Sequence, residues 1–87
     1  MEIKKLSAEV KKNGFIYKLI ERNENKCLYA QTKNNEINGY EVFKIKISKD
    51  RFAYDALYEP FPYNEEFGKR AWYYQHLNNA MKKYNTI

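Results

Sequence analysis

The side chains with the greatest chemical potential in this sequence are its only thiol, Cys27, and its only imidazole, His76. A thiol beside an imidazole is an activated nucleophile, provided that the two groups lie within hydrogen-bond distance and a third group orients the base. Cys27 and His76 are far apart in the sequence, so only the fold could bring them together, and no third group stands out. We therefore expect no catalytic residues and no enzymatic activity, with Cys27 as a small semi-buried side chain and His76 on a helix surface.

Metal and phosphate chemistry lack their usual motifs. The sequence has no cluster of Cys or His at ligand spacing, and Glu59, Glu65 and Glu66 form no paired-carboxylate motif. The glycines are scattered and form no phosphate-binding loop: Gly14, Gly39 and Gly68. We expect neither a metal site nor a cofactor.

Binding through aromatic side chains is better supported. If residues 62–84 form a helix, one stripe of it is apolar: Phe67, Ala71, Tyr74, Leu77, Met81 and Tyr84. The only tryptophan, Trp72, falls on the opposite side, together with Lys69, His76 and Asn79. Tryptophan is enriched among the residues that dominate protein–protein binding energies. Trp72 is therefore a candidate anchor for a partner. The alternatives are that it folds over the helix shoulder, is covered by the aromatic loop before the helix, or lies in a helix packed on both sides.

The candidate protein-binding residues are those of this polar side and two aromatic residues of the preceding loop: Trp72, His76, Lys69, Asn79, Tyr58 and Phe61.

The exposed face of the expected sheet is a second candidate surface. Lys18, Lys44 and Lys46 should point outwards there, and Tyr29 and Tyr40 are the tyrosines that could lie among them. Rings interleaved with lysines form a stacking platform for single-stranded nucleic acid. The alternative is that these lysines only solubilise the sheet and block edge pairing.

Length and composition indicate a single domain over residues 1–87. One cysteine excludes an internal disulfide and fits a reducing cytoplasm, and the first twelve residues contain no apolar run typical of a secretory signal. No segment approaches the roughly 18–20 apolar residues of a membrane span. We expect a cytoplasmic protein without membrane contact, either a monomer or a homodimer.

The charge of the chain favours anionic partners only mildly. The net charge is +5 and the isoelectric point is near 9.3. The basic residues are mainly lysines, with only Arg22, Arg51 and Arg70 as arginines. Because specific base recognition favours the arginine fork, the composition argues against sequence-specific DNA recognition.

The elements that must position these residues are strands followed by a helix. Residues 15–22 and 27–33 alternate as two paired strands, and residues 40–49 form the clearest strand, with Phe43, Ile45 and Ile47 facing inwards. Asn38-Gly39 is a hairpin signal before that strand. Residues 1–13 favour an extended or irregular segment, because a helix of this length is unstable alone.

The connection and the helix complete the expected fold. Residues 50–63 show no clean period, and their rings form either a lid over one end of the core or a functional loop, with a fourth short strand around residues 52–57 as a further option. Asn64 can cap the helix, and the charges of its first and last turns suit the helix dipole. The fold class is α+β: a three- or four-stranded antiparallel sheet with one C-terminal helix packed on one face, and the other face exposed to water.

Several stretches carry a resemblance. Residues 40–45 (YEVFKI), 59–62 (EPFP) and 64–72 (NEEFGKRAW), with residues 13–17 (NGFIY) near the start, resemble small uncharacterised proteins of Bacteroides-type gut bacteria and their tailed phages. The resemblance spans about residues 13–84. It implies a phage or mobile-element accessory protein and transfers no functional residue.

The resulting functional prediction is a small non-enzymatic binding module for a protein partner, such as an inhibitor of a host or defence factor. The alternative is a nucleic-acid-binding module that uses the basic, tyrosine-bearing face of the sheet.

Overall fold

The computed structural model describes residues 3–50 and 56–87 and contains two sheets and one α-helix. The main sheet is antiparallel, in the order β2 (Glu9–Lys12), β3 (Phe15–Arg22), β4 (Lys26–Lys33), β5 (Glu36–Lys44) and β8 (Ala71–Tyr74). The small sheet has the order β1 (Ile3–Lys4), β7 (Ala56–Tyr58) and β6 (Ser48–Asp50). A 3-10 turn, η1 (Asn64–Glu66), precedes β8, and α1 (Leu77–Thr86) follows it. The predicted α+β class with an antiparallel sheet and a C-terminal helix is confirmed, but the main sheet has five strands rather than three or four.

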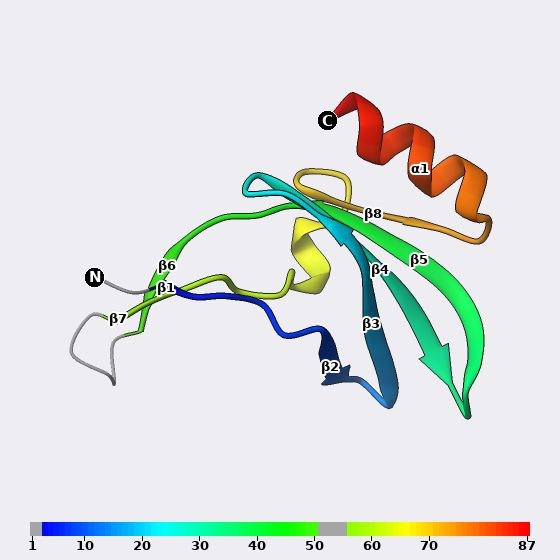
Figure 1. Ribbon diagram of the computed structural model, residues 1–87, viewed down its shortest axis with the longest axis horizontal. Helices are drawn as coiled ribbons and strands as arrows, with labels where there is room; N and C mark the ends of the chain where they lie inside the picture. The colour runs from blue at the N-terminus through cyan, green and yellow to red at the C-terminus, as the bar shows by residue number, and fades with distance from the viewer. Residues whose placement is uncertain (1–2, 51–55) are drawn as a thin grey trace.

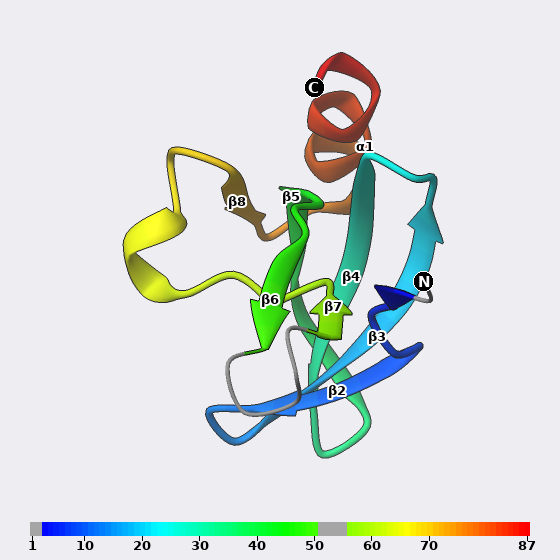
Figure 2. The same cartoon turned by 90° about the vertical axis from the view of Figure 1, so that its left-hand side faces the viewer.

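The main sheet is strongly curved, and other elements of the chain lie on both of its faces (Figure 1). Helix α1 lies on the outer side, where it packs on β4, β5 and β8. The turn η1 lies on the inner side, and the small sheet extends beyond one end of the main sheet (Figures 1 and 2).

The predicted helix over residues 62–84 is wrong in its first half. The chain turns at Gly68, whose φ of +87° lies in the left-handed region, and the following Ala-Trp-Tyr-Tyr run joins the main sheet as β8. Three consecutive aromatic residues favour a strand, and pairing with β5 satisfies their backbone groups. Asn64 therefore opens η1 and caps no α-helix. A basic residue does lie in the last turn of α1, Lys83.

The β2–β3 and β4–β5 hairpins turn at asparagine residues. Asn13 and Gly14 join β2 to β3 with φ of 54° and 82°, and Asn34 and Asn35 join β4 to β5 with φ of 53° and 64°. Positive φ at both central residues matches the twist of two-residue hairpin turns. The predicted turn at Asn38-Gly39 is wrong, because both residues lie within β5.

Gly39 has a packing role instead. A Cβ at this position would overlap the ring and hydroxyl of Tyr73. The register between β4 and β5 shifts just beside it, opposite Gln31 and Thr32, as in a β-bulge. Glycine is therefore required here because the β8 ring lies directly against the β5 backbone.

The ambiguous segments are mostly extended. Residues 3–12 contain β1 and β2, as expected for an extended N-terminal segment. The predicted strand over residues 40–49 is interrupted after Lys44 and resumes as β6, which leaves Ile47 54 % exposed rather than facing inwards. The predicted short strand over residues 52–57 overlaps β7 only at its last two residues. The rest of it, residues 52–55, lies outside the described residues.

Both faces of the main sheet are covered, contrary to the expectation of one wet face. On the helix face, α1 packs over a cluster of buried residues: Leu28, Val42, Ala80 and Tyr84. On the other face, a second cluster contains Tyr17, Cys27, Tyr29, Phe43 and Ala71. We call residues 59–63, which cross this second face, the strap, and the face itself the strap face. The helix face stays open on β2 and β3, where Glu9, Lys11, Lys18 and Ile20 are exposed.

Phe61 fixes the strap to the core. Its ring centroid lies 4.8 Å from that of Tyr17, 5.3 Å from that of Tyr29 and 5.1 Å from that of Phe43. Such tilted and edge-to-face contacts are favourable arrangements of aromatic rings. For Phe61, the expectation that this connection acts as a lid over the core is confirmed.

Candidate binding surface

Trp72 lies on β8 and not on a helix. Its Cα partner on β5 is Val42, so its ring points to the helix face. Because α1 runs back over β8, the ammonium of Lys83 reaches 4.1 Å from the centre of the Trp72 ring. This distance is typical of a cation–π contact. Trp72 is thus half-buried, with α1 covering it through Lys83.

Exposed aromatic and apolar groups continue from Trp72 around the edge of the sheet. Tyr73 is 40 % exposed, and Leu77, in the first turn of α1, is 41 % exposed. His76 and Asn79 are exposed beside Leu77, and the His76 side chain makes no helix-capping hydrogen bond. We call Trp72, Tyr73, His76, Leu77 and Asn79 the corner surface. Trp72 and Tyr73 point to opposite faces, so this surface wraps around the sheet edge.

The backbone of β8 is partly open at this edge. The carbonyl of Ala71 accepts a hydrogen bond from the Gly68 amide at 2.8 Å, whereas that of Arg70 accepts one from Lys44 of β5. Since backbone groups alternate along an antiparallel strand, the amide and carbonyl of Tyr73 point away from β5, like those of Ala71. Residues 3–50 and 56–87 provide no backbone partner for them.

The predicted protein-binding set is only partly brought together. Lys69 is exposed in the turn that leads into β8 and so lies near the corner surface in the chain. Tyr58 belongs to β7 in the small sheet. Phe61 is committed to the core of the strap face. Sequence periodicity could not separate these residues, because it assumed one helix and one loop.

The predicted nucleic-acid platform is not assembled. Tyr29 is fully buried on the strap face, where its hydroxyl donates to the Ser7 carbonyl at 2.7 Å. Tyr40 packs against the α1 cluster. Lys46 forms an ion pair with Glu66 at 2.7 Å. The two remaining lysines lie apart from each other, on β3 and at the end of β5: Lys18 and Lys44.

Cys27 and His76 do not form a nucleophile–base pair. Cys27 is fully buried on the strap face, and burial raises the pKa of its thiol well above the usual range. His76 is exposed at the start of α1. A thiol that stays protonated and has no neighbouring imidazole is not activated as a nucleophile.

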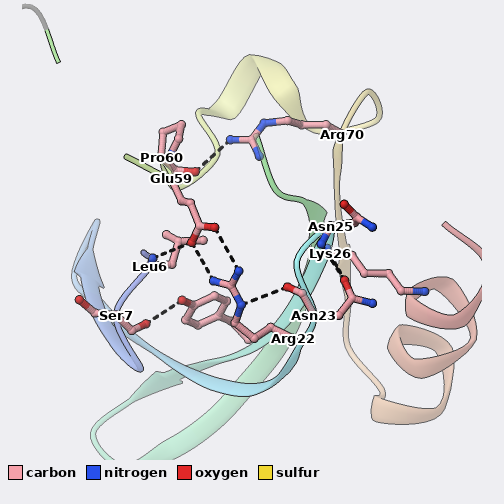
Figure 3. Close-up of polar contacts among 10 residues, drawn as sticks. Leu6, Ser7, Arg22, Asn23, Asn25, Lys26, Glu59, Pro60 and Arg70 are labelled. Carbon is pink, nitrogen blue, oxygen red and sulfur yellow. Dashed lines mark hydrogen bonds and ion pairs between the residues drawn. The ribbon is translucent and has the colours of Figure 1, made fainter. Parts of the chain in front are cut away.

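A pocket of about 290 Å³ lies where the small sheet meets the main sheet. Its lining includes Arg22 and Glu59, which form an ion pair (Figure 3). The two Arg22 Nη atoms donate to the two Glu59 oxygens at 2.7 Å and 3.0 Å, and the Leu6 amide donates to the same carboxylate at 2.9 Å. Hydrogen bonds from Arg22 lower the pKa of Glu59 against the opposing effect of burial.

The position of Arg22 depends on a β-bulge. The register between β3 and β4 shifts between Leu19 and Glu21, so that Arg22 pairs with Cys27 and points to the strap face. A regular strand would have placed Arg22 on the other face, as the sequence alternation predicted. The pocket rim adds cationic, anionic and apolar side chains without a dominant charge: Ile3, Lys5, Glu24, Asn25 and Ile47. We interpret the ion pair as a clasp between the two sheets.

Glu41 is the most unusual carboxylate in the described residues. It is 5 % exposed, and its Oε2 has no hydrogen-bond partner. Burial raises its pKa to about 7, although a hydrogen bond from Tyr17 and the charge of Lys12 lower it. The neighbouring amide of Gln31 donates to the Tyr17 hydroxyl at 2.8 Å. Glu41, Gln31 and Tyr17 are all buried, so we expect the titration of Glu41 to affect the stability of the fold and not binding.

The distribution of charge along the sequence is a further signal, which helical periodicity does not take into account. Residues 67–87 include Lys69, Arg70, Lys82 and Lys83 but no Asp or Glu. In the fold this acid-free segment is β8, α1 and the turn before them. The guanidinium of Arg70 donates to the Pro60 carbonyl in the strap (Figure 3) and to the carboxylate of Glu66 in η1. Lys83 contacts Trp72 in the corner surface, and Lys69 and Lys82 are exposed.

Among residues 3–50 and 56–87, no three His, Cys, Asp or Glu side chains gather closely enough to hold a metal ion. No helix in these ranges has the length and apolar character needed to cross a membrane. Neither a protein-family model, nor a curated protein, nor a solved structure matches the chain.

Proposed function

We propose that this protein is a small non-enzymatic binding module that engages a protein partner through the corner surface. The observation that carries the proposal is the exposure of Tyr73 and Leu77 beside the half-buried Trp72 at an open sheet edge. Aromatic side chains are enriched in the central parts of protein–protein interfaces. An edge strand with outward backbone groups adds hydrogen-bonding capacity to the same surface.

A protein partner is favoured over nucleic acid by the state of the aromatic rings. Bases stack on exposed ring faces, but one face of Trp72 is taken by Lys83, and Tyr29 and Tyr40 are packed in the two cores. The role of a phage or mobile-element accessory protein, for example an inhibitor of a host or defence factor, rests on the sequence resemblance alone and is part of the proposal.

Affinity capture with matched variants tests the proposal. Wild-type protein, Trp72→Ala, Leu77→Ser and Ile20→Ser are immobilised, and captured proteins from a host lysate are quantified by mass spectrometry. Ile20 is the control, because its 47 % exposure resembles that of Leu77 but it lies on β3, away from the corner surface. We expect a partner that wild type and Ile20→Ser retain equally and that both corner variants lose by about tenfold.

Circular dichroism must first show that each variant is folded. If Trp72→Ala is unfolded, Leu77→Ser alone tests the corner surface. If folded corner variants capture the same proteins in the same amounts as wild type, the assignment of the corner surface is wrong. Light scattering at several concentrations then shows whether the partner is a second copy of the chain.

A further inference from the structure

Three lysines lie on the helix face near the last turn of α1. Lys26 of β4 and Lys44 of β5 are directly opposite each other in the sheet register. Lys26 lies 4.7 Å from the centre of the Tyr84 ring and donates to the carbonyl oxygens of Tyr84 and Ile87. The third, Lys83, belongs to the last turn of α1 and contacts Trp72. We call Lys26, Lys44 and Lys83 the lysine patch.

The lysine patch has no internal charge compensation from carboxylates. In the described parts of the chain, the ion pairs join Glu59 to Arg22, and Glu66 to Lys46 and Arg70. None involves a member of the patch. Glu21 is the carboxylate that faces the patch from β3: burial raises the pKa of Tyr84, and the charge of Glu21 adds to this effect.

This arrangement is unfavourable for the isolated protein. Like charges directly opposite each other in a sheet destabilise it, and Lys26 is stabilised by the Tyr84 ring and by the carbonyls at the end of α1. Lys44 is exposed, and none of the ion pairs among the described residues involves its ammonium. Carboxylates placed over the patch would convert this repulsion into attraction.

We infer that the partner of the corner surface is an acidic protein segment whose carboxylates lie on the lysine patch while its apolar side chains contact Trp72. The inference rests on the proposed function and adds the chemistry of the partner. An acidic protein fits better than nucleic acid, because the patch contains no arginine for bidentate phosphate contacts and Lys83 already contacts one face of the Trp72 ring. It combines exposed charge with a neighbouring apolar surface instead.

The test compares two variants of equal net charge. Lys44→Glu with Lys83→Glu changes the patch, and Lys11→Glu with Lys18→Glu changes two exposed lysines of β2 and β3. Either pair of substitutions lowers the net charge from +5 to about +1. Fluorescence anisotropy measures binding to a labelled, capped peptide of alternating Glu and Leu. A labelled oligo(dT) of equal charge is measured in parallel, at low and moderate salt.

The patch variant should bind the acidic peptide about tenfold more weakly than wild type, and the β2–β3 variant less than about twofold more weakly. Equal losses in both variants overturn the inference, because net charge alone then explains binding. Tighter binding of oligo(dT) than of the peptide also overturns it and identifies the patch as a nucleic-acid surface. If a captured partner depends on Leu77 but is retained by the patch variant, the inference is wrong and the proposed function stands.

Discussion

Replacement of Glu41 by glutamine should abolish a specific pH dependence of stability. The folded protein holds the pKa of this buried carboxyl at about 7, compared with 4.5 for the same group in an unfolded chain. Between these two values the unfolded chain has lost the Glu41 proton and the folded chain retains it. Stability therefore falls as the pH rises from about 4.5 to above 7, because the unfolded state binds fewer protons.

The magnitude follows from the two pKa values. They differ by about 2.5 pH units, and each unit corresponds to about 1.4 kcal/mol. The free energy of unfolding should thus decrease by about 3 kcal/mol between pH 4.5 and pH 8. This is a large share of the total stability expected for a small domain.

Two other carboxylates act in the opposite direction at lower pH. Hydrogen bonds from Arg22 lower the pKa of Glu59, and those from Lys46 and Arg70 lower that of Glu66 despite its burial. Their contributions are present above pH 4.5 and are lost as the pH falls through the lowered values. Wild-type protein should consequently be most stable slightly above pH 4.5.

Denaturation with urea at a series of pH values measures the effect, with Trp72 fluorescence and circular dichroism as independent probes. Glu41→Gln should show a flat profile between pH 5 and pH 8, because glutamine does not titrate. Glu9→Gln is the control, since Glu9 is an exposed carboxylate of β2 and its removal should leave the slope unchanged. The reasoning is refuted if wild-type stability stays constant or rises over this interval, or if Glu41→Gln keeps the wild-type slope.

Three further substitutions test the packing of the strap and of β8. Arg22→Ala leaves the carboxylate of Glu59, only 6 % exposed, without its charged partner and should lower the free energy of unfolding by about 3 kcal/mol in urea titrations. Gly39→Ala introduces a Cβ into the space of the Tyr73 ring and should cost about 2 kcal/mol by the same measurement. Phe61→Ala removes the ring that joins strap and core and should lower the thermal midpoint through a loss of about 3 kcal/mol, measured by calorimetry.

Each of these substitutions has a matched control. Lys46→Ala removes a more exposed ion pair, with 44 % exposure of the lysine side chain, and should cost less than about 1 kcal/mol. If it costs as much as Arg22→Ala, burial does not explain the effect. In the Gly39→Ala background, Tyr73→Ala should recover part of the lost free energy of unfolding, because the ring that overlaps the new Cβ is removed. If the two losses simply add, the overlap does not explain the effect. The folded Phe61→Ala variant should still bind the partner. A loss of binding without a loss of folding would show that Phe61 contacts the partner.

Local patterns were sufficient for the strands that are stabilised by their own hairpins. Alternation predicted β3 at residues 15–22, and it placed β4 within one residue of its observed start at Lys26. The lysine-rich composition and the absence of acids in residues 67–87 are also properties of the sequence alone. These features need no partner elsewhere in the chain, so they can be recognised locally.

The helix prediction failed where local and remote effects compete. The apolar spacing over residues 67–84 does mark buried positions, since Ala71 and Tyr84 are both buried. Its first half nevertheless forms β8, because pairing with β5 satisfies backbone groups that an isolated aromatic run satisfies poorly. Helical periodicity therefore indicated which side chains are buried but not which backbone structure buries them.

The sequence by itself determined the composition of this protein, the pairing of β3 with β4 and the chemical types available for binding. Only the tertiary structure decided which of those side chains meet. The bulge between Leu19 and Glu21 turned Arg22 towards Glu59, and the register of β4 and β5 placed Lys26 opposite Lys44. The return of α1 over β8 brought Lys83 to Trp72. Register and bulges arise from pairing between segments remote in the chain, and a shift of one residue moves every side chain to the other face.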